Sequence, residues 1–240
     1  MTPPAPDRVL PALLLALTAV TGFVDAVSYL ALGHVFTANM TGNVVFLGFA
    51  MATAPGLSIA RSGAALGAFV IGAIIGGRLA ARMGSGPRHR WMSAGFAIEA
   101  ALLLAAAALA AGAGDDLLRD PQPLYGLIAL TGLAMGVRNA VVRKVAERDL
   151  TTTVLTLTIT GIAADSSLAR GANPGWTRRG ASVAAMFAGA AAGAWLLRYS
   201  VALPVAISGA ISAACALGVR VAGSNAAAGS PEAPSPQRHG

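Results

Sequence analysis

The chain has little charge and almost no cysteine. Only 11% of its 240 residues are charged, whereas a soluble domain carries about 25%, and 55% are hydrophobic. Because several apolar stretches are long enough to cross a bilayer, we predict an all-α polytopic membrane protein. Cys215 is the sole cysteine, so the chain cannot form an internal disulfide, and the composition implies no oxidising compartment.

Motifs for catalysis and cofactor binding are also missing from the sequence. The three histidines are His34, His89 and His239, too scattered to suggest a metal cluster with the one cysteine. We find no phosphate-binding loop, no Gly-x-Ser-x-Gly and no dinucleotide fingerprint after a strand. We therefore expect no enzyme activity, no metal and no cofactor. The net charge of +7 lies in loops, where it favours lipid headgroups over nucleic acid as the partner.

Two polar segments interrupt this apolar sequence. The first is Thr-Ala-Asn-Met-Thr-Gly-Asn at 37–43, and the second runs from Thr151 to Gly161. A bilayer tolerates such segments only where protein or a water-filled cavity covers them. Each occupies a similar place in its half of the chain, which is typical of a duplicated fold with a site between the halves.

The halves correspond at other positions as well. Gly22 and Asp25 match Gly136 and Asn139, each 114 residues later. Thr37 and Thr41 match Thr152 and Thr156 after a one-residue insertion, and Gly72 with Gly76 matches Gly189 with Gly193. We predict a lead at 1–8, one transmembrane domain at 9–221 with repeats at 9–113 and 121–221, and a disordered tail at 222–240.

The basic residues distinguish two topologies. If all eight apolar stretches crossed the membrane, Lys and Arg would divide evenly between its two sides. If 36–53 and 151–165 instead enter and leave on one face, six spans remain, at 9–33, 60–81, 91–113, 123–142, 180–197 and 199–219. Thirteen basic residues then share the inner face: Arg8, Arg78, Arg82, Arg88, Arg90, Arg143, Lys144, Arg148, Arg170, Arg178, Arg179, Arg220 and Arg238. This bias favours six spans with both termini inside, and three spans per half make the repeats inverted.

Several polar residues within the apolar stretches are candidates for a binding site. Asp25 lies deep in the first span, where a carboxylate suggests a proton or cation site, a partner for Arg138, or a structural hydrogen-bond acceptor. A Thr hydroxyl is weaker evidence for a binding site than a carboxylate, because Thr side chains often join helices by hydrogen bonds. Glu99 is a proton relay, an interior hydrogen-bonded residue, or a sign that the edge of the span at 91–113 lies elsewhere. The candidate site for a polar solute or ion comprises Asp25, Asn39, Thr41, Asn43, Arg138, Asn139, Thr152 and Thr156.

Small residues predict close helix packing. Gly63, Gly67, Gly72 and Gly76 form two pairs spaced by four residues, a spacing that lets two helices approach each other closely.

The segments 21–29 and 36–43 resemble a known family. Thr-Gly-Phe-Val-Asp-Ala-Val-Ser-Tyr, followed by Phe-Thr-Ala-Asn-Met-Thr-Gly-Asn, is similar to the signature of the YoaK-like family, domain-of-unknown-function family 1275. Segments 136–140 and 151–161 resemble its second signature, although Leu157 stands where that family usually has Gly. The resemblance implies a multi-span protein of the bacterial inner membrane and supplies no activity.

Two functions remain open at this point. The symmetric polar segments favour a transporter or channel for a small polar solute or ion, and a homo-oligomer is compatible with the sequence. The alternative is a non-transporting membrane scaffold or accessory subunit, in which the Asn and Thr side chains bond to each other in a dry, packed interior.

Overall fold

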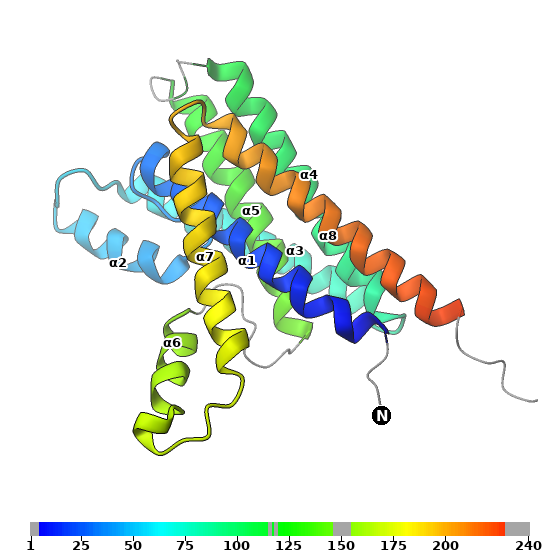
Figure 1. The fold of residues 1–240 in the computed structure, drawn as a ribbon. Helices are drawn as coiled ribbons and strands as arrows, with labels where there is room; N and C mark the ends of the chain where they lie inside the picture. The colour runs from blue at the N-terminus through cyan, green and yellow to red at the C-terminus, as the bar shows by residue number, and fades with distance from the viewer. Residues whose placement is uncertain (1–4, 115–116, 118–119, 146–154, 229–240) are drawn as a thin grey trace, which may run out of the picture.

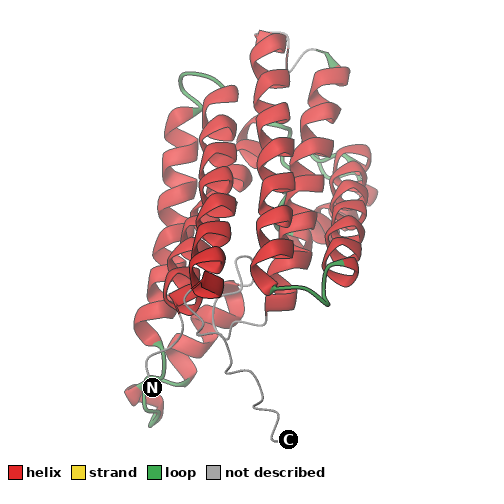
Figure 2. Ribbon diagram, turned by 90° about the vertical axis from the view of Figure 1, so that its right-hand side faces the viewer, coloured by secondary structure: helices red, strands yellow, loops and turns green. Residues whose placement is uncertain are grey.

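The computed structural model describes residues 5–114, 117, 120–145 and 155–228. Most of these residues lie in helices joined by loops, and no strand occurs among them (Figure 2). In chain order the elements are α1 Ala5–Ala31, α2 Met40–Met51, α3 Ile59–Arg82, α4 Arg88–Ala113, α5 Pro121–Val145, α6 Leu155–Ala164, the 3-10 helix η2 Ser167–Ala169, α7 Trp176–Leu196 and α8 Ala202–Ala228.

Five of the described helices are long and apolar enough to cross a membrane: α1 from Val9, α3, α4, α5, and α8 as far as Asn225. A span needs about 20 predominantly apolar residues, and these have 23 to 26. The predicted fold class, an all-α polytopic membrane protein, is confirmed. α7 has 21 residues but is not one of the five, because it begins Trp-Thr-Arg-Arg-Gly and is rich in Ala and Gly.

The long helices pack in pairs around a common core. α1 lies against α7 and α8, α5 lies against α3 and α4, and α4 packs along α8 (Figure 1). The core between them contains fully buried apolar side chains such as Leu17, Leu103, Leu127 and Met135.

Glycines let two of these pairs approach closely. A Cβ at Gly22 in α1 would overlap the carbonyl oxygen of Met186 in α7, and one at Gly189 would overlap that of Ala19. In the same way, a Cβ at Gly72 in α3 would overlap the carbonyl of Leu133 in α5. The packing role predicted for α3 holds for Gly72 and Gly76 only. Gly63 and Gly67 face open space.

The segment between α1 and α2 folds back along α1. The Ala38 amide donates to Asp25 Oδ1 at 3.3 Å, and the Thr37 amide donates to Ser28 Oγ at 3.3 Å. Asp25 is six residues before the end of α1, so α2 begins about 9 Å below that end. Gly33 lies against the Arg61 side chain, which brings the end of α1 and the start of α3 together.

The short helices α2 and α6 lie outside the group of long helices (Figure 1). Both are apolar and too short to cross a membrane, with 12 and 10 residues.

The C-terminal helix is longer than the sequence predicted. We expected the chain to leave its last helix by residue 222, but α8 continues to Ala228. Residues 222–228 are Ala, Gly, Ser and Asn, and the next proline is Pro231, so no helix-breaking ring interrupts this segment. The helix start likewise extends into the predicted N-terminal lead, because α1 begins at Ala5.

Candidate site: a polar pocket between two short helices

A pocket of about 410 Å³ lies where α2 and α6 meet α1 and α7. We call it the polar pocket. It contains four of the eight predicted site residues, namely Asp25, Asn39, Thr41 and Thr156. Its remaining lining residues are Thr21, Gly42, Val45, Phe46, Leu155 and Met186.

The polar pocket lies at mid-height of the long helices. Thr21 is near the middle of the apolar stretch Val9–Ala31 of α1, Asp25 lies one turn nearer its C-terminal end, and Met186 is near the middle of α7. Both short helices contribute residues: Thr41 and Gly42 from the N-terminal turn of α2, and Leu155 and Thr156 from the first described residues of α6. The N-terminus of α2, which carries a partial positive charge, therefore lies at the pocket.

Asp25 both lines the polar pocket and fixes the adjacent loop. Its side chain is only 7% exposed, and Oδ1 accepts the hydrogen bond from the Ala38 amide. Asp25 therefore has one of the roles considered from the sequence, that of a structural acceptor for a backbone N–H. Because the carboxyl also lines the pocket, it remains available to a bound solute or proton.

Asn39 is the N-terminal cap residue of α2, but its side chain makes no capping hydrogen bond. Within the described ranges, neither this amide nor the Thr41 hydroxyl has a side-chain hydrogen-bond partner, while both residues line the polar pocket. These two groups can therefore donate or accept hydrogen bonds toward an occupant.

Asn43 was predicted to line the site, but the structure places it elsewhere. Its Oδ1 accepts from the Phe36 amide at 2.9 Å, and its Nδ2 donates to the Phe36 carbonyl oxygen. With 1% exposure, it is committed to holding the loop before α2. The reason is local: both polar atoms of this amide are taken up by the backbone of Phe36, seven residues earlier in the loop.

Arg138 contacts the pocket residue Thr21 and pairs with Glu99 of α4 instead of Asp25. Its Nη1 is 3.2 Å from Glu99 Oε1 and donates to the Leu17 carbonyl at 2.8 Å. Its Nη2 donates to Thr21 Oγ1 at 2.6 Å, and Glu99 Oε1 also accepts from Ser212 Oγ at 3.0 Å. This buried network ties α1, α4, α5 and α8 together and reaches the pocket through Thr21.

Of the two remaining predicted residues, Asn139 does not line the polar pocket. The Asn139 amide donates to the carbonyl oxygen of Met135 in its own helix at 2.8 Å. Thr152 lies outside the described residues.

Thr21 and Met186 are the main lining residues that sequence reasoning missed. Thr21 precedes Asp25 by four residues, so both lie on one face of α1, and that spacing was the available signal. Met186 is apolar within an Ala-rich helix, and nothing in its spacing distinguished it from a lipid-facing or core residue.

The fold and the pocket together define a multi-pass, all-helical membrane protein with a polar pocket inside its helical region. The model of the family described as "Protein of unknown function (DUF1275)" matches residues 13–218. The chain therefore belongs to that family, as the segments at 21–29 and 36–43 indicated.

A curated relative is also named as a transmembrane protein. The chain is 37% identical over 157 residues to "UPF0700 transmembrane protein YoaK" of Bacillus subtilis (strain 168). The match covers 64% of this chain and 65% of that relative. No solved structure matches the chain.

Proposed function

We propose that this protein is a transporter or channel for a small polar solute or ion in the bacterial plasma membrane, and not an enzyme. The observation that carries the proposal is the polar pocket at mid-height of α1 and α7. Polar groups at that depth are otherwise unfavourable in a bilayer, and discontinuous helices that end at a midplane pocket are typical of transport proteins.

In this proposal the chain has two inverted repeats, α1–α4 and α5–α8. The packing of α1 on α7 corresponds to that of α5 on α3, and α8 on α1 corresponds to α4 on α5. The glycines Gly22 and Gly189 at the first interface correspond to Gly136 and Gly72 at the second. A two-fold axis relating these pairs would pass between α4 and α8, which pack on each other.

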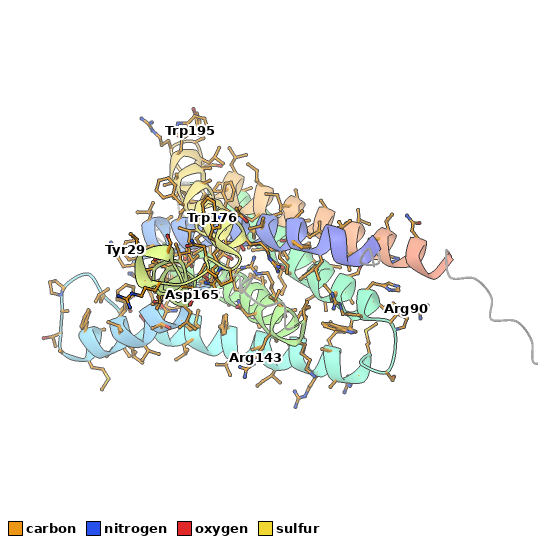
Figure 3. All side chains as sticks on the ribbon, turned by 60° about the horizontal axis from the view of Figure 1, so that its bottom comes forward. Tyr29, Arg90, Arg143, Asp165, Trp176 and Trp195 are labelled. Carbon is orange, nitrogen blue, oxygen red and sulfur yellow. The ribbon has the colours of Figure 1, made fainter. Side chains whose placement is uncertain are left out.

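Such an arrangement requires α7 to be the sixth span. Trp176 and Trp195, both exposed, mark the two ends of this helix (Figure 3). They are separated by about 28 Å along the helix axis, close to the hydrocarbon thickness of a bilayer, and Trp is enriched at both interfaces. Both termini are then cytoplasmic, with Arg143 and Lys144 at the inner end of α5.

The short helices are re-entrant in this proposal, α2 from the outer face and α6 from the inner face. The support for α2 is that its loop folds back to Asp25 while α3 begins beside Gly33. Residues of the two helices then meet in the polar pocket from opposite sides, an arrangement typical of transporters with inverted repeats.

Cysteine accessibility tests the proposal. In a Cys215→Ser background, whose hydroxyl can replace the thiol near the Leu13 carbonyl, single cysteines are placed at positions 39, 41 and 156. We expect a small, membrane-impermeant thiol reagent to label all three in folded protein. Val44→Cys is the matched control, because Val44 is 58% exposed on α2 and does not line the pocket. Facing lipid, it should resist the reagent.

Either failure of this pattern is informative. Protection of positions 39, 41 and 156 from both sides would indicate a sealed interior and favour the scaffold function. Labelling at position 44 as fast as at position 41 would place α2 in water and contradict the re-entrant arrangement. If the expected pattern is found, solute flux into proteoliposomes, compared with flux into protein-free vesicles, is the next measurement.

A further inference from the structure

We propose that the polar pocket binds a small organic monocation, namely a primary ammonium ion with a short apolar body. This inference rests on the proposed transport function and names the class of solute. Three features carry it: a buried carboxyl group without a basic partner, an aromatic ring fixed in the lining, and an apolar side that suits a carbon chain.

Asp25 is the acidic residue of the pocket, and no basic side chain neutralises it. It is 7% exposed and lines the pocket. Among the described residues it takes part in no ion pair, because Arg138 is paired with Glu99 and their formal charges cancel. A carboxylate at this depth in a bilayer is unfavourable without a partner of opposite charge. A bound cation supplies that partner.

The polar contact that Asp25 makes comes from the backbone. Its Oδ1 accepts from the Ala38 amide at 3.3 Å, in the segment that leads into α2. The N-terminus of α2 carries roughly half a positive charge, which is less than the full charge of an ionised carboxylate. These groups therefore hold the Asp25 side chain in place and leave it part of its negative charge, which favours a cation in the pocket over an anion.

Phe46 places an aromatic ring in the same pocket. It is the last ring of a stack in which the centroids of Tyr29 and Phe36 are 5.2 Å apart and those of Phe36 and Phe46 are 5.6 Å apart. The backbone of Phe36 is in turn held by the Asn43 side chain, so the stack has a fixed base. Because Phe36 covers one face of Phe46, the remaining face and edge bound the pocket. The face of an aromatic ring attracts a cation within about 6 Å of the ring centroid.

The rest of the lining distinguishes an organic cation from a metal ion. Val45 and Met186 join Phe46 on an apolar side that offers no oxygen ligand, whereas hard metal cations need oxygen ligands around them. An alkylammonium ion instead carries three N–H donors on one side and a carbon chain on the other. The oxygens of Asn39 and Thr41 can accept the donors that the carboxylate does not use. The volume of about 410 Å³ suits such a small organic molecule.

Three probes with one carbon skeleton test the charge of the solute: isoamylamine, which is protonated at neutral pH, the neutral isoamyl alcohol, and the anion isovalerate. Binding to the full-length protein in an uncharged maltoside detergent is measured by calorimetry, after subtraction of the same titrations into detergent alone. We expect isoamylamine to bind at least about tenfold more tightly than isoamyl alcohol, because its ammonium group pairs with Asp25. Isovalerate should bind more weakly than the alcohol, because the same carboxylate repels it.

Other orders of affinity would overturn the inference and leave the proposed function intact. Isoamylamine binding no tighter than isoamyl alcohol, including no binding of either, would exclude a site for organic cations. Tightest binding of isovalerate would identify a site for anions. In both cases, cysteines at positions 39, 41 and 156 would still label if the pocket is open to water. Protection of those cysteines from both sides would instead remove the transport function and this inference together.

Asp25→Asn tests the carboxylate directly. The amide oxygen can still accept from the Ala38 amide, so the variant loses the charge and keeps the loop contact. We expect the affinity for isoamylamine to fall at least about tenfold, to that for isoamyl alcohol. Asp120→Asn is the matched control, because Asp120 is exposed, accepts from the Gln122 amide and does not line the pocket. An affinity for isoamylamine that Asp25→Asn leaves unchanged would overturn the inference.

Phe46→Leu provides a second variant should Asp25→Asn fail to fold. It removes the aromatic ring and keeps an apolar side chain in the lining. We expect the affinity for isoamylamine to fall about two- to thirtyfold, with a smaller change for isoamyl alcohol, because only the cation is attracted to the ring. Phe49→Leu is the matched control, since Phe49 is 52% exposed on α2 and does not line the pocket. Equal changes for the amine and the alcohol would contradict a cation at this ring.

Discussion

Arg138 Nη1 and Glu99 Oε1 are 3.2 Å apart, and neither side chain has any exposed surface. The sequence suggested Asp25 as the partner of Arg138, because the two lie close to corresponding positions in the halves of the chain. The structure instead joins α5 to α4, and Arg138 reaches α1 through the Leu17 carbonyl and the Thr21 hydroxyl. As a result, Asp25 does not share its carboxyl with a guanidinium.

Replacing one partner of this ion pair should destabilise the protein more than replacing both partners. Glu99→Gln leaves Arg138 charged and buried, and we expect a loss of about 3–5 kcal/mol. The double variant Glu99→Gln with Arg138→Met should recover part of this loss, because no buried charge remains. Thermal unfolding in one detergent, followed by loss of the monodisperse chromatographic peak, measures the difference. A single variant as stable as wild type would show that the pair is not formed.

Two glycines of α3 give a matched test of the helix packing. Gly72 faces the backbone of α5, where a Cβ would overlap the Leu133 carbonyl, whereas Gly67 faces open space. We expect Gly72→Ala to lose about 1–3 kcal/mol through overpacking. Gly67→Ala should retain or slightly raise stability, since Ala favours the helix over Gly. Equal midpoints in the same thermal assay would contradict the packing of α3 on α5.

Asn43 lies two positions after Thr41, and the two should give opposite results. Asn43→Ala removes both bonds to the Phe36 backbone and leaves those groups unpaired, so we expect a loss of about 1–3 kcal/mol. Thr41→Val should keep stability within about 0.5 kcal/mol, as surface changes usually do, but should weaken solute binding. Stability and flux are measured on the same preparations, and reversed results would exchange the roles assigned to the two residues.

The sequence predicted the helical class, the two short polar segments and four of the ten residues that line the pocket. These features depend on local signals: long apolar stretches, their interruption, and polar groups placed within them. The sequence did not distinguish Asn39, which lines the pocket, from Asn43, which holds a loop, because both are Asn in one motif. The partner of Arg138 could not be predicted either, since Glu99 is 39 residues away and meets it only through the packing of α4 on α5.

The end of the last helix was missed for a different reason. Small residues at 222–228 suggested a tail by composition, yet Ala is the strongest helix former, and no proline intervenes before residue 231. Gly223 and Ser224 do not end α8, which continues through both residues.

The position of α7 in the membrane can be measured by the fluorescence of single tryptophans. The chain has three, and Trp91 is largely buried, with 7% of its surface exposed, so a variant that retains only Trp91 serves as the control. In variants that retain only Trp176 or only Trp195, we expect quenching by lipids brominated near the headgroup. A third variant lacks all native tryptophans and carries Phe187→Trp, at an exposed site near the middle of α7. Lipids brominated near the ends of their acyl chains should quench it. Quenching of position 187 by aqueous iodide would place α7 outside the bilayer and contradict the six-span arrangement.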